Sequence, residues 1–339
     1  MNKKIGITAL CLLLSICALA ACIFLRGKLE NDSMTVTPAQ TPAQSGDLVT
    51  RPTTVATDAT APSARPVGGS DAQSTTATTA ATVTTAVPRD GDFAFTEQQT
   101  KQLDSMLAGF GGQVAALYTD LETGYTYTYN ADKTFSAASL TKAPYCLYLL
   151  QLAADGKCDL EQKLTYTDKI GSNGTGIVKK SPFGTQFTVG QLIEYTLRYS
   201  DNAALRMLRG AYPANGFQKY AATIGIKNTA AIGLITNSRI TANDAAIYMR
   251  AIHAFIRDNP TYGGMLHEYM THSNNKMFAS QYPLVRKYGW ADKAFHEMAL
   301  VEAPHPYILV LLTDHEDGTA QDFAMFRNFS KTVEAIANH

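Results

Sequence analysis

The distribution of aromatic residues limits which part of this chain can form a globular fold. The chain has 339 residues with 14 Phe, 17 Tyr and 1 Trp, yet none of these lies between Asn31 and Asp92. That stretch is rich in Thr, Ala, Pro and Ser, as in TTATTAATVTT. Such a composition cannot bury enough apolar surface to offset its ordering entropy. We therefore expect residues 31–90 to be a disordered stalk and residues 91–339 to form one globular domain.

An apolar segment precedes the stalk. Residues 5–25 carry no charge, and their length matches the about 20 residues that cross a bilayer core. The lysines of the opening MNKK favour a cytoplasmic N-terminus. Residues 1–30 are therefore either an uncleaved signal anchor or a lipoprotein signal in which Cys22 of LAAC is acylated. Both interpretations predict an extracytoplasmic domain attached to the cell membrane.

Charge and short motifs exclude several classes of partner. The chain has 29 basic and 29 acidic residues, so its formal net charge is zero and nucleic acid is not an expected partner. No GxxxxGK[ST] or GxGxxG motif is present, and neither HEYMT nor HEMAL completes an HExxH motif. We therefore expect no cofactor and no metal, and a monomeric catalytic domain.

The hydropathy pattern of residues 91–339 predicts a mixed α/β (α+β) domain. QVAALYTDLETGYTYTYN at 113–130 alternates around a Gly-containing turn, which is typical of a hairpin. Strands at both ends of the domain, with helices between them, imply an antiparallel sheet in which the N- and C-terminal parts meet. Further strands are predicted at 282–290, 295–303 and 307–314, and helices near 139–155, 188–198, 202–210, 214–223, 241–257, 261–270 and 319–337, with Thr188 and Thr241 as N-caps.

A serine and a lysine lie at the start of the most apolar predicted helix. In FSAASLTKAPYCLYLLQL, Ser139 and Lys142 form an S-x-x-K pair, and positions i and i+3 share one helix face. An ammonium is costly to bury unless it is paired, so Lys142 either extends to solvent or takes part in chemistry with Ser139. A neutral lysine could accept the serine proton. A second S-x-x-K, SNNK at 273–276, lies in a polar stretch and is attributed to chance.

Two further motifs follow in chain order. Ser200, Asp201 and Asn202 form an S-D-N tripeptide between two predicted helices, where a plain turn with Asp201 or Asn202 as N-cap is the alternative. VRKYGW at 285–290 places Lys287 on a predicted strand, where a solvated lysine on an edge strand is the alternative.

The three motifs in this order resemble those of the penicillin-recognising serine hydrolases, the class A β-lactamases and related D,D-peptidases. The resemblance covers nearly all of residues 91–339. It implies a fold in which an antiparallel sheet is flanked by helices, beside an all-helical lobe with the site between them. The substrate implied is a β-lactam or a peptidoglycan peptide.

The resemblance also implies a role for each motif residue. Ser139 matches the acylated nucleophile and Lys142 its proton-transfer partner. Ser200 matches the hydroxyl that relays a proton to the leaving nitrogen, and Asn202 the side chain that binds substrate and orients Lys142. Lys287 matches the cation that holds the substrate carboxylate and lowers the pKa of Lys142.

The end of the third motif contributes to substrate binding as well. The backbone N–H groups of Ser139 and Trp290 would form the oxyanion hole, beside Gly289. Members of the family usually have Thr or Ser between the Lys and the Gly, whereas this chain has Tyr288. The small hydroxyl that helps to hold a carboxylate is therefore missing.

A second departure concerns hydrolysis of the acyl-enzyme. Class A β-lactamases activate the deacylating water with a loop glutamate, but no Asp or Glu occurs from Ala203 through Asn243. The motifs favour a membrane-tethered serine hydrolase that is acylated at Ser139 and then loses the acyl group slowly. A D,D-carboxypeptidase-type enzyme and a non-catalytic cell-wall-binding module on the same fold remain the alternatives.

Overall fold

The computed structural model describes residues 91–231, 238–316 and 318–338, all of which belong to one compact unit. The predicted membrane segment and stalk lie outside these residues. Among the helices of the described ranges, none is both long and apolar enough to cross a membrane.

A five-stranded antiparallel sheet forms the centre of the domain, in the order β2-β1-β9-β8-β7. The predicted hairpin is β1 (Val114–Asp120) with β2 (Thr126–Tyr129). The three predicted C-terminal strands are β7 (Leu284–Ala291), β8 (Ala294–Val301) and β9 (Tyr307–Thr313). The N- and C-terminal parts meet where β1 pairs with β9, which leaves β7 at the edge of the sheet.

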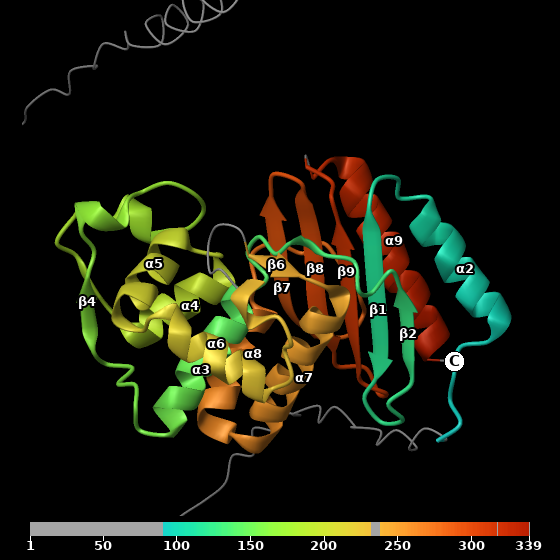
Figure 1. The fold of residues 1–339 in the computed structure, drawn as a ribbon, viewed down its shortest axis with the longest axis horizontal. Helices are drawn as coiled ribbons and strands as arrows, with labels where there is room; N and C mark the ends of the chain where they lie inside the picture. The colour runs from blue at the N-terminus through green and yellow to red at the C-terminus, as the bar shows by residue number, and fades with distance from the viewer. Residues whose placement is uncertain (1–90, 232–237, 317, 339) are drawn as a thin grey trace, which may run out of the picture. The chain divides into compact units, whose positions relative to one another are not determined.

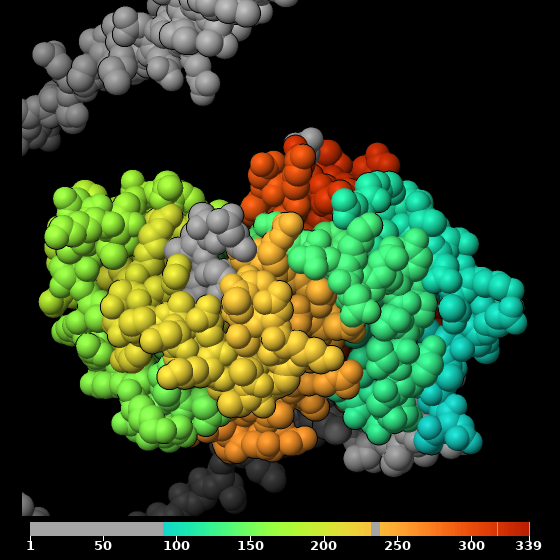
Figure 2. Space-filling model, viewed as in Figure 1, coloured from blue at the N-terminus to red at the C-terminus, as the bar shows by residue number. Residues whose placement is uncertain are grey.

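Both faces of the sheet are covered, so its strands are apolar on both sides. On one face lie α2 (Glu97–Ala108) and α9 (Ala320–Ala337), which Figure 1 shows side by side. On the other lie α7 (Ala242–Asp258) and α8 (Pro260–Thr271), which connect the sheet to the helical lobe. In the space-filling view, atoms of this region pack directly against the hairpin (Figure 2).

The lobe is built around α3 (Lys142–Ala154), whose side chains are buried almost all round. A helix that is apolar on every side belongs in a core. Against it pack α4 (Val189–Arg198) and α6 (Ala214–Thr223), and α5 (Asn202–Ala211) packs on α4. The lobe also contains β4 (Lys163–Thr165) paired with β5 (Gln186–Thr188), and its three short 3-10 helices are Asp168–Ile170, Val178–Lys180 and Thr229–Ala231.

Capping residues explain where several helices begin. Thr188 and Thr241 both accept the backbone N–H three residues on, which confirms the two predicted N-caps. The sequence analysis did not predict α2, although Thr96 and Gln99 form a capping box at its start. It also did not predict the short pair of β3 (Phe135–Ser136) with β6 (Arg239–Ile240), because two-residue strands have no periodicity.

A buried ion pair fixes the segment that leads into β7. The Glu297 carboxylate is fully buried on β8 and lies 3.3 Å from Arg286 Nη1 on β7. It also accepts the backbone N–H of Phe278, and Arg286 donates to the Phe278 carbonyl at 3.1 Å. The pair therefore ties residues just before β7 to the sheet.

We expect Glu297→Gln to lower the free energy of unfolding by about 3–5 kcal/mol, because it leaves the buried Arg286 guanidinium without its counter-charge. Urea unfolding of the full-length chain measures this. Glu97→Gln is the matched control, since Glu97 pairs with Lys101 on the surface, and should change the value by less than about 0.5 kcal/mol. Equal, small effects of both substitutions would contradict the structural role of the buried pair.

Candidate active site

Ser139 lies in the turn between β3 and α3 rather than on the helix. Leu140 N–H donates to the Ala137 carbonyl and Lys142 N–H to the Ser139 carbonyl, both i to i+3 bonds. Ala138 has a φ of 44°, a left-handed conformation that non-glycine residues rarely adopt. The α-helix consequently begins three residues later than predicted, at Lys142, and Ser139 is partly exposed at its start.

Lys142 points inward and not to solvent. Its side chain is buried, with 3% of its surface exposed. Its Nζ donates to the Ser200 carbonyl at 2.6 Å, to Ser200 Oγ at 3.1 Å and to Asn202 Oδ1 at 2.6 Å. The predicted contact with Asn202 is therefore present. No hydrogen bond from Lys142 to the Ser139 hydroxyl is found in the described part of the chain, because the three donors of the ammonium all have acceptors on residues 200–202.

Ser200 lies between two lysines. Its Oγ is 3.1 Å from Lys142 Nζ and also 3.1 Å from Lys287 Nζ. Ser200 is buried, and its φ of 51° is left-handed, which is a strain that functional sites often hold. Lys287 is fully buried on the edge strand β7, so the alternative of a solvated edge lysine is wrong.

Burial governs the charges of both lysines. Burial is the main reason that the pKa of Lys142 is lowered to about 7; the Asp201 carboxylate opposes this fall, and the Arg206 guanidinium adds a smaller lowering effect. Burial also holds the pKa of Lys287 well below its usual value, and the charge of Lys142 adds to this. The fall in the pKa of Lys142 therefore comes from desolvation, and not from Lys287 as the sequence analysis had predicted.

A glycine-containing loop that the sequence analysis missed holds the S-D-N turn in place. Asp201 caps α5 by accepting the Ala204 N–H, and it also accepts the N–H groups of Ile177 and Val178 at 2.6 and 2.8 Å. Asp201 is therefore an N-cap, as in the alternative interpretation, and the same turn also carries the predicted site residues Ser200 and Asn202. The Asp201 carboxylate is occupied by these backbone donors.

Close approach explains two of the three glycines of that loop, GSNGTG at 171–176. A Cβ built at Gly174 would lie 1.9 Å from Asn202 Nδ2, and one at Gly176 would lie 2.1 Å from Asp201 Cγ. Thr175, between them, donates its hydroxyl to the Ser200 carbonyl at 2.7 Å. The closely spaced glycines were the signal in the sequence that could have revealed this loop.

The end of β7 lies against the Ser139 turn. A Cβ built at Gly289 would be 3.1 Å from the Ala137 carbonyl oxygen and from Leu140 Cγ, so only glycine permits this contact without a shift. Trp290 follows, 39% exposed, with its indole N–H donating to the Glu316 carbonyl. The two residues predicted to form the oxyanion hole are thus on adjoining segments.

Tyr288, the unusual residue of the third motif, is buried beside the lysines. Its ring centroid lies 3.8 Å from Lys287 Nζ, and the side chains of Ser200 and Asn275 lie beside its hydroxyl and lower its pKa, against the larger effect of burial. Asn275 belongs to SNNK, which is not helical, as expected for a chance match to S-x-x-K. Its contact with Tyr288 was not predicted.

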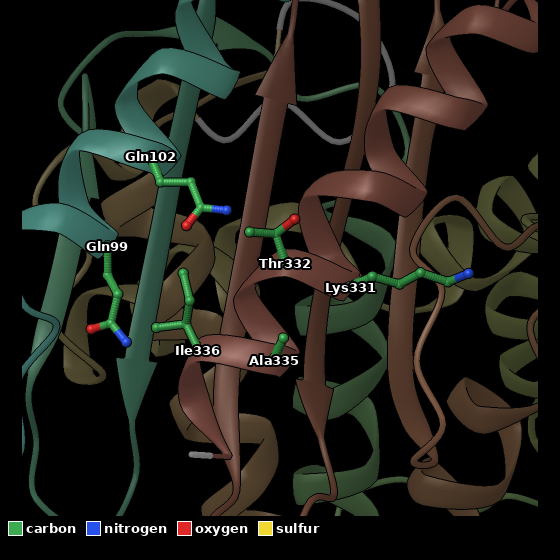
Figure 3. A pocket seen from close by; sticks show the side chains of 6 residues that line it. All are labelled: Gln99, Gln102, Lys331, Thr332, Ala335 and Ile336. Carbon is green, nitrogen blue, oxygen red and sulfur yellow. The ribbon is translucent and has the colours of Figure 1, made fainter.

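A hollow away from the lysines has a different lining. A hollow between α2 and α9 is lined by amide, hydroxyl, amine and alkyl side chains without any thiol or carboxylate (Figure 3). It lies on the sheet face opposite the lobe. Within the described ranges, no three His, Cys, Asp or Glu side chains form a potential metal site. The lining residues of the hollow are Gln99, Gln102, Lys331, Thr332, Ala335 and Ile336.

Solved structures share this fold. A PBP-A mutant, described as an acyl-enzyme complex with penicillin G, matches with a TM-score of 0.64 at 16% identity, over 71% of this chain and 97% of its own. A β-lactamase from Sphaerobacter thermophilus matches with a TM-score of 0.65 at 14% identity, over 72% and 98%. The predicted fold, an antiparallel sheet flanked by helices with a helical lobe, is confirmed.

Curated proteins match over a shorter stretch. β-Lactamase SME-1 of Serratia marcescens is 26% identical over 127 residues, which is 37% of this chain and 43% of that protein. A β-lactamase of Bacillus licheniformis is 33% identical over 117 residues, 34% of each chain. The chain thus spans less than half the length of these curated relatives.

A family model covers most of the domain. The model described as the β-lactamase enzyme family matches residues 98–337, which includes all three motifs and both faces of the sheet. The chain therefore belongs to the β-lactamase enzyme family, and the predicted kinship with its serine hydrolases is confirmed.

Proposed function

We propose that the domain is a serine hydrolase that is acylated at Ser139 by β-lactams or cell-wall peptides and releases the acyl group slowly. The observation that supports this most is the state of Lys142. It is buried one turn from Ser139, burial lowers its pKa to about 7, and it contacts Ser200 and Asn202. A desolvated amine that is neutral near physiological pH can act as a general base.

Loss of one proton changes what Lys142 can do. The ammonium uses three donors on three acceptors, whereas the neutral amine has two donors and a lone pair. Deprotonation therefore releases one of those hydrogen bonds and gives the nitrogen an acceptor position for the Ser139 proton. Ser139 Oγ then attacks the carbonyl carbon, the C–N bond breaks, and the leaving nitrogen takes a proton through Ser200.

The second half of the reaction lacks an evident base. No carboxylate occurs between Ala203 and Asn243, and Asp201 is engaged by three backbone N–H groups. Water that attacks the Ser139 ester would have to use Lys142 or Ser200. This favours slow release, and it keeps the D,D-carboxypeptidase-type enzyme as the second catalytic candidate.

A non-catalytic cell-wall-binding module is the competing proposal from a different class. The substitution at Tyr288 supports it, because the third motif is altered and its lysine is covered. Formation of a covalent adduct with a β-lactam separates the two proposals.

We further propose that the domain is held outside the cytoplasm by the segment at 5–25, through a membrane span or a lipid on Cys22. The support is the uncharged run and the flanking lysines. Metabolic labelling with a fatty-acid analogue, in the chain and in Cys22→Ala, would distinguish the two modes of attachment.

Penicillin G should add its whole mass to the full-length chain, because acylation opens the lactam ring without loss of atoms. Intact-mass spectrometry of the chain in detergent measures the adduct. Ser139→Ala should abolish it. Ser273→Ala is the matched control from the second S-x-x-K and should keep it, since the Ser273 hydroxyl has no hydrogen-bond partner among the described residues. An adduct that survives in Ser139→Ala would refute the assigned nucleophile.

The adduct should persist. General base catalysis is worth roughly 10²–10⁴-fold, and without a loop carboxylate the acyl-enzyme should be hydrolysed more slowly by about that factor. The decay of the adduct mass after removal of free penicillin measures this rate. Rapid turnover of a chromogenic cephalosporin that depends on Ser139 would show that another group supplies the base.

Acylation should depend on pH through Lys142. Below its pKa of about 7 the ammonium cannot accept the Ser139 proton, so the second-order rate constant should fall about tenfold per pH unit. Above that pKa the rate should level off. Adduct formation timed between pH 5 and 9, with thermal unfolding recorded at each pH, tests this. A flat profile from pH 5.5 to 8.5 in a folded chain would contradict the role of Lys142.

A further inference from the structure

Tyr288 covers the cation that the family resemblance assigns to the substrate carboxylate. The ring centroid lies 3.8 Å from Lys287 Nζ. Lys287 is fully buried, and Tyr288 itself is only 3% exposed. The amine therefore lies beneath the aromatic ring, and a ligand cannot reach it from solvent while the ring is in this position.

The remaining directions around Lys287 Nζ are also filled. It donates to Ser200 Oγ at 3.1 Å and to the Tyr288 carbonyl at 2.8 Å. With the ring on its third side, no donor is left pointing into open space. A carboxylate would have to displace one of these partners before it could bind.

The ring is enclosed at its far end as well. The side chains of Ser200 and Asn275 lie beside the Tyr288 hydroxyl and lower its pKa, and Asn275 lies in the segment between α8 and β7. Burial has the larger effect and raises the pKa of Tyr288, so the phenol stays neutral beside the lysines. Moving the ring away would expose a buried aromatic side chain to water, which is costly.

We propose that Tyr288 determines substrate specificity by closing the anion subsite at Lys287, so that a free carboxylate on the leaving group gains no cation and the site favours acyl donors without one. The proposal rests on the proposed function, because it names the substrate class of the same Ser139 site. A neutral ester or amide needs no cation at this position. A carboxylate placed there would be desolvated against an aromatic ring without a partner.

Two forms of one β-lactam test the proposal. Penicillin G carries a free carboxylate, and its methyl ester does not, while the reacting lactam is the same. In the unaltered full-length chain, acylation by the methyl ester should be as fast as acylation by the acid or faster. Tyr288→Thr exposes Lys287 and adds a small hydroxyl. It should raise the acid-to-ester rate ratio about tenfold or more, as expected for gaining a charge-assisted hydrogen bond.

A matched variant separates the ring from the hydroxyl. Tyr288→Phe keeps the covering ring and should keep the rate ratio of the unaltered chain. A ratio that rises as much in Tyr288→Phe as in Tyr288→Thr would overturn the proposal, because the ring would not be the barrier. An unaltered chain that reacts at least about tenfold faster with the acid would overturn it as well.

Equilibrium binding keeps the test independent of acylation. In Ser139→Ala, N-acetyl-D-alanyl-D-alanine should bind no more tightly than its C-terminal amide, measured by NMR titration. Adding Tyr288→Thr should favour the acid by about tenfold or more. Absence of an adduct from both penicillin G and its methyl ester in the unaltered chain would refute the proposed function, whereas tighter binding of the acid in Ser139→Ala alone would refute the role of Tyr288. That comparison stands even if Tyr288→Thr does not fold.

Discussion

Two buried lysines that share one serine hydroxyl are the interaction on which the site depends. Ser200 Oγ lies 3.1 Å from the nitrogen of Lys142 and 3.1 Å from that of Lys287. Two ammonium groups this close, with no carboxylate bound to either in the described residues, cannot both keep their charge out of water. The arrangement therefore yields at least one neutral amine near neutral pH. A buried base beside a serine is the requirement for Ser–Lys chemistry.

The fold brings three segments that are distant in the sequence together at the two lysines: the turn that carries Ser139, the S-D-N turn and β7. Pairing of β1 with β9 closes the sheet and leaves β7 as its edge, next to the lobe. Gly289 lets β7 approach the turn that carries Ser139, and Gly174 and Gly176 let a lobe loop approach the S-D-N turn. A side chain at Gly174 or Gly176 would overlap the S-D-N turn, and one at Gly289 would force a small shift of its neighbours. Left-handed backbone at Ala138 and Ser200 is retained because these neighbours hold it.

Two departures from the family pattern both affect how an anionic β-lactam would be bound and hydrolysed. The absence of a loop carboxylate removes the usual base for deacylation, and Tyr288 removes access to the cation that usually holds a substrate carboxylate. Four residues of the family motifs, Ser139, Lys142, Ser200 and Asn202, are present, whereas the loop carboxylate is absent and the residue after Lys287 is changed. We infer that the chain uses the family's nucleophile on a different set of acyl donors.

The sequence by itself determined the sheet, most of the helices and the two N-caps, because these depend on local periodicity and on residue types with specific chemistry. That the motif residues share one site was implied by the resemblance of the three motifs to a known family. The sequence did not reveal α2, whose hydrophobic face is weak, or the glycine loop at 171–176. Only the tertiary structure decided that Lys142 bonds to Ser200 rather than to Ser139, and that the ring of Tyr288 lies over the amine of its chain neighbour Lys287. The Lys142–Ser200 contact joins residues 58 positions apart, and desolvation, the main cause of both lysine pKa shifts, is a property of the packed core.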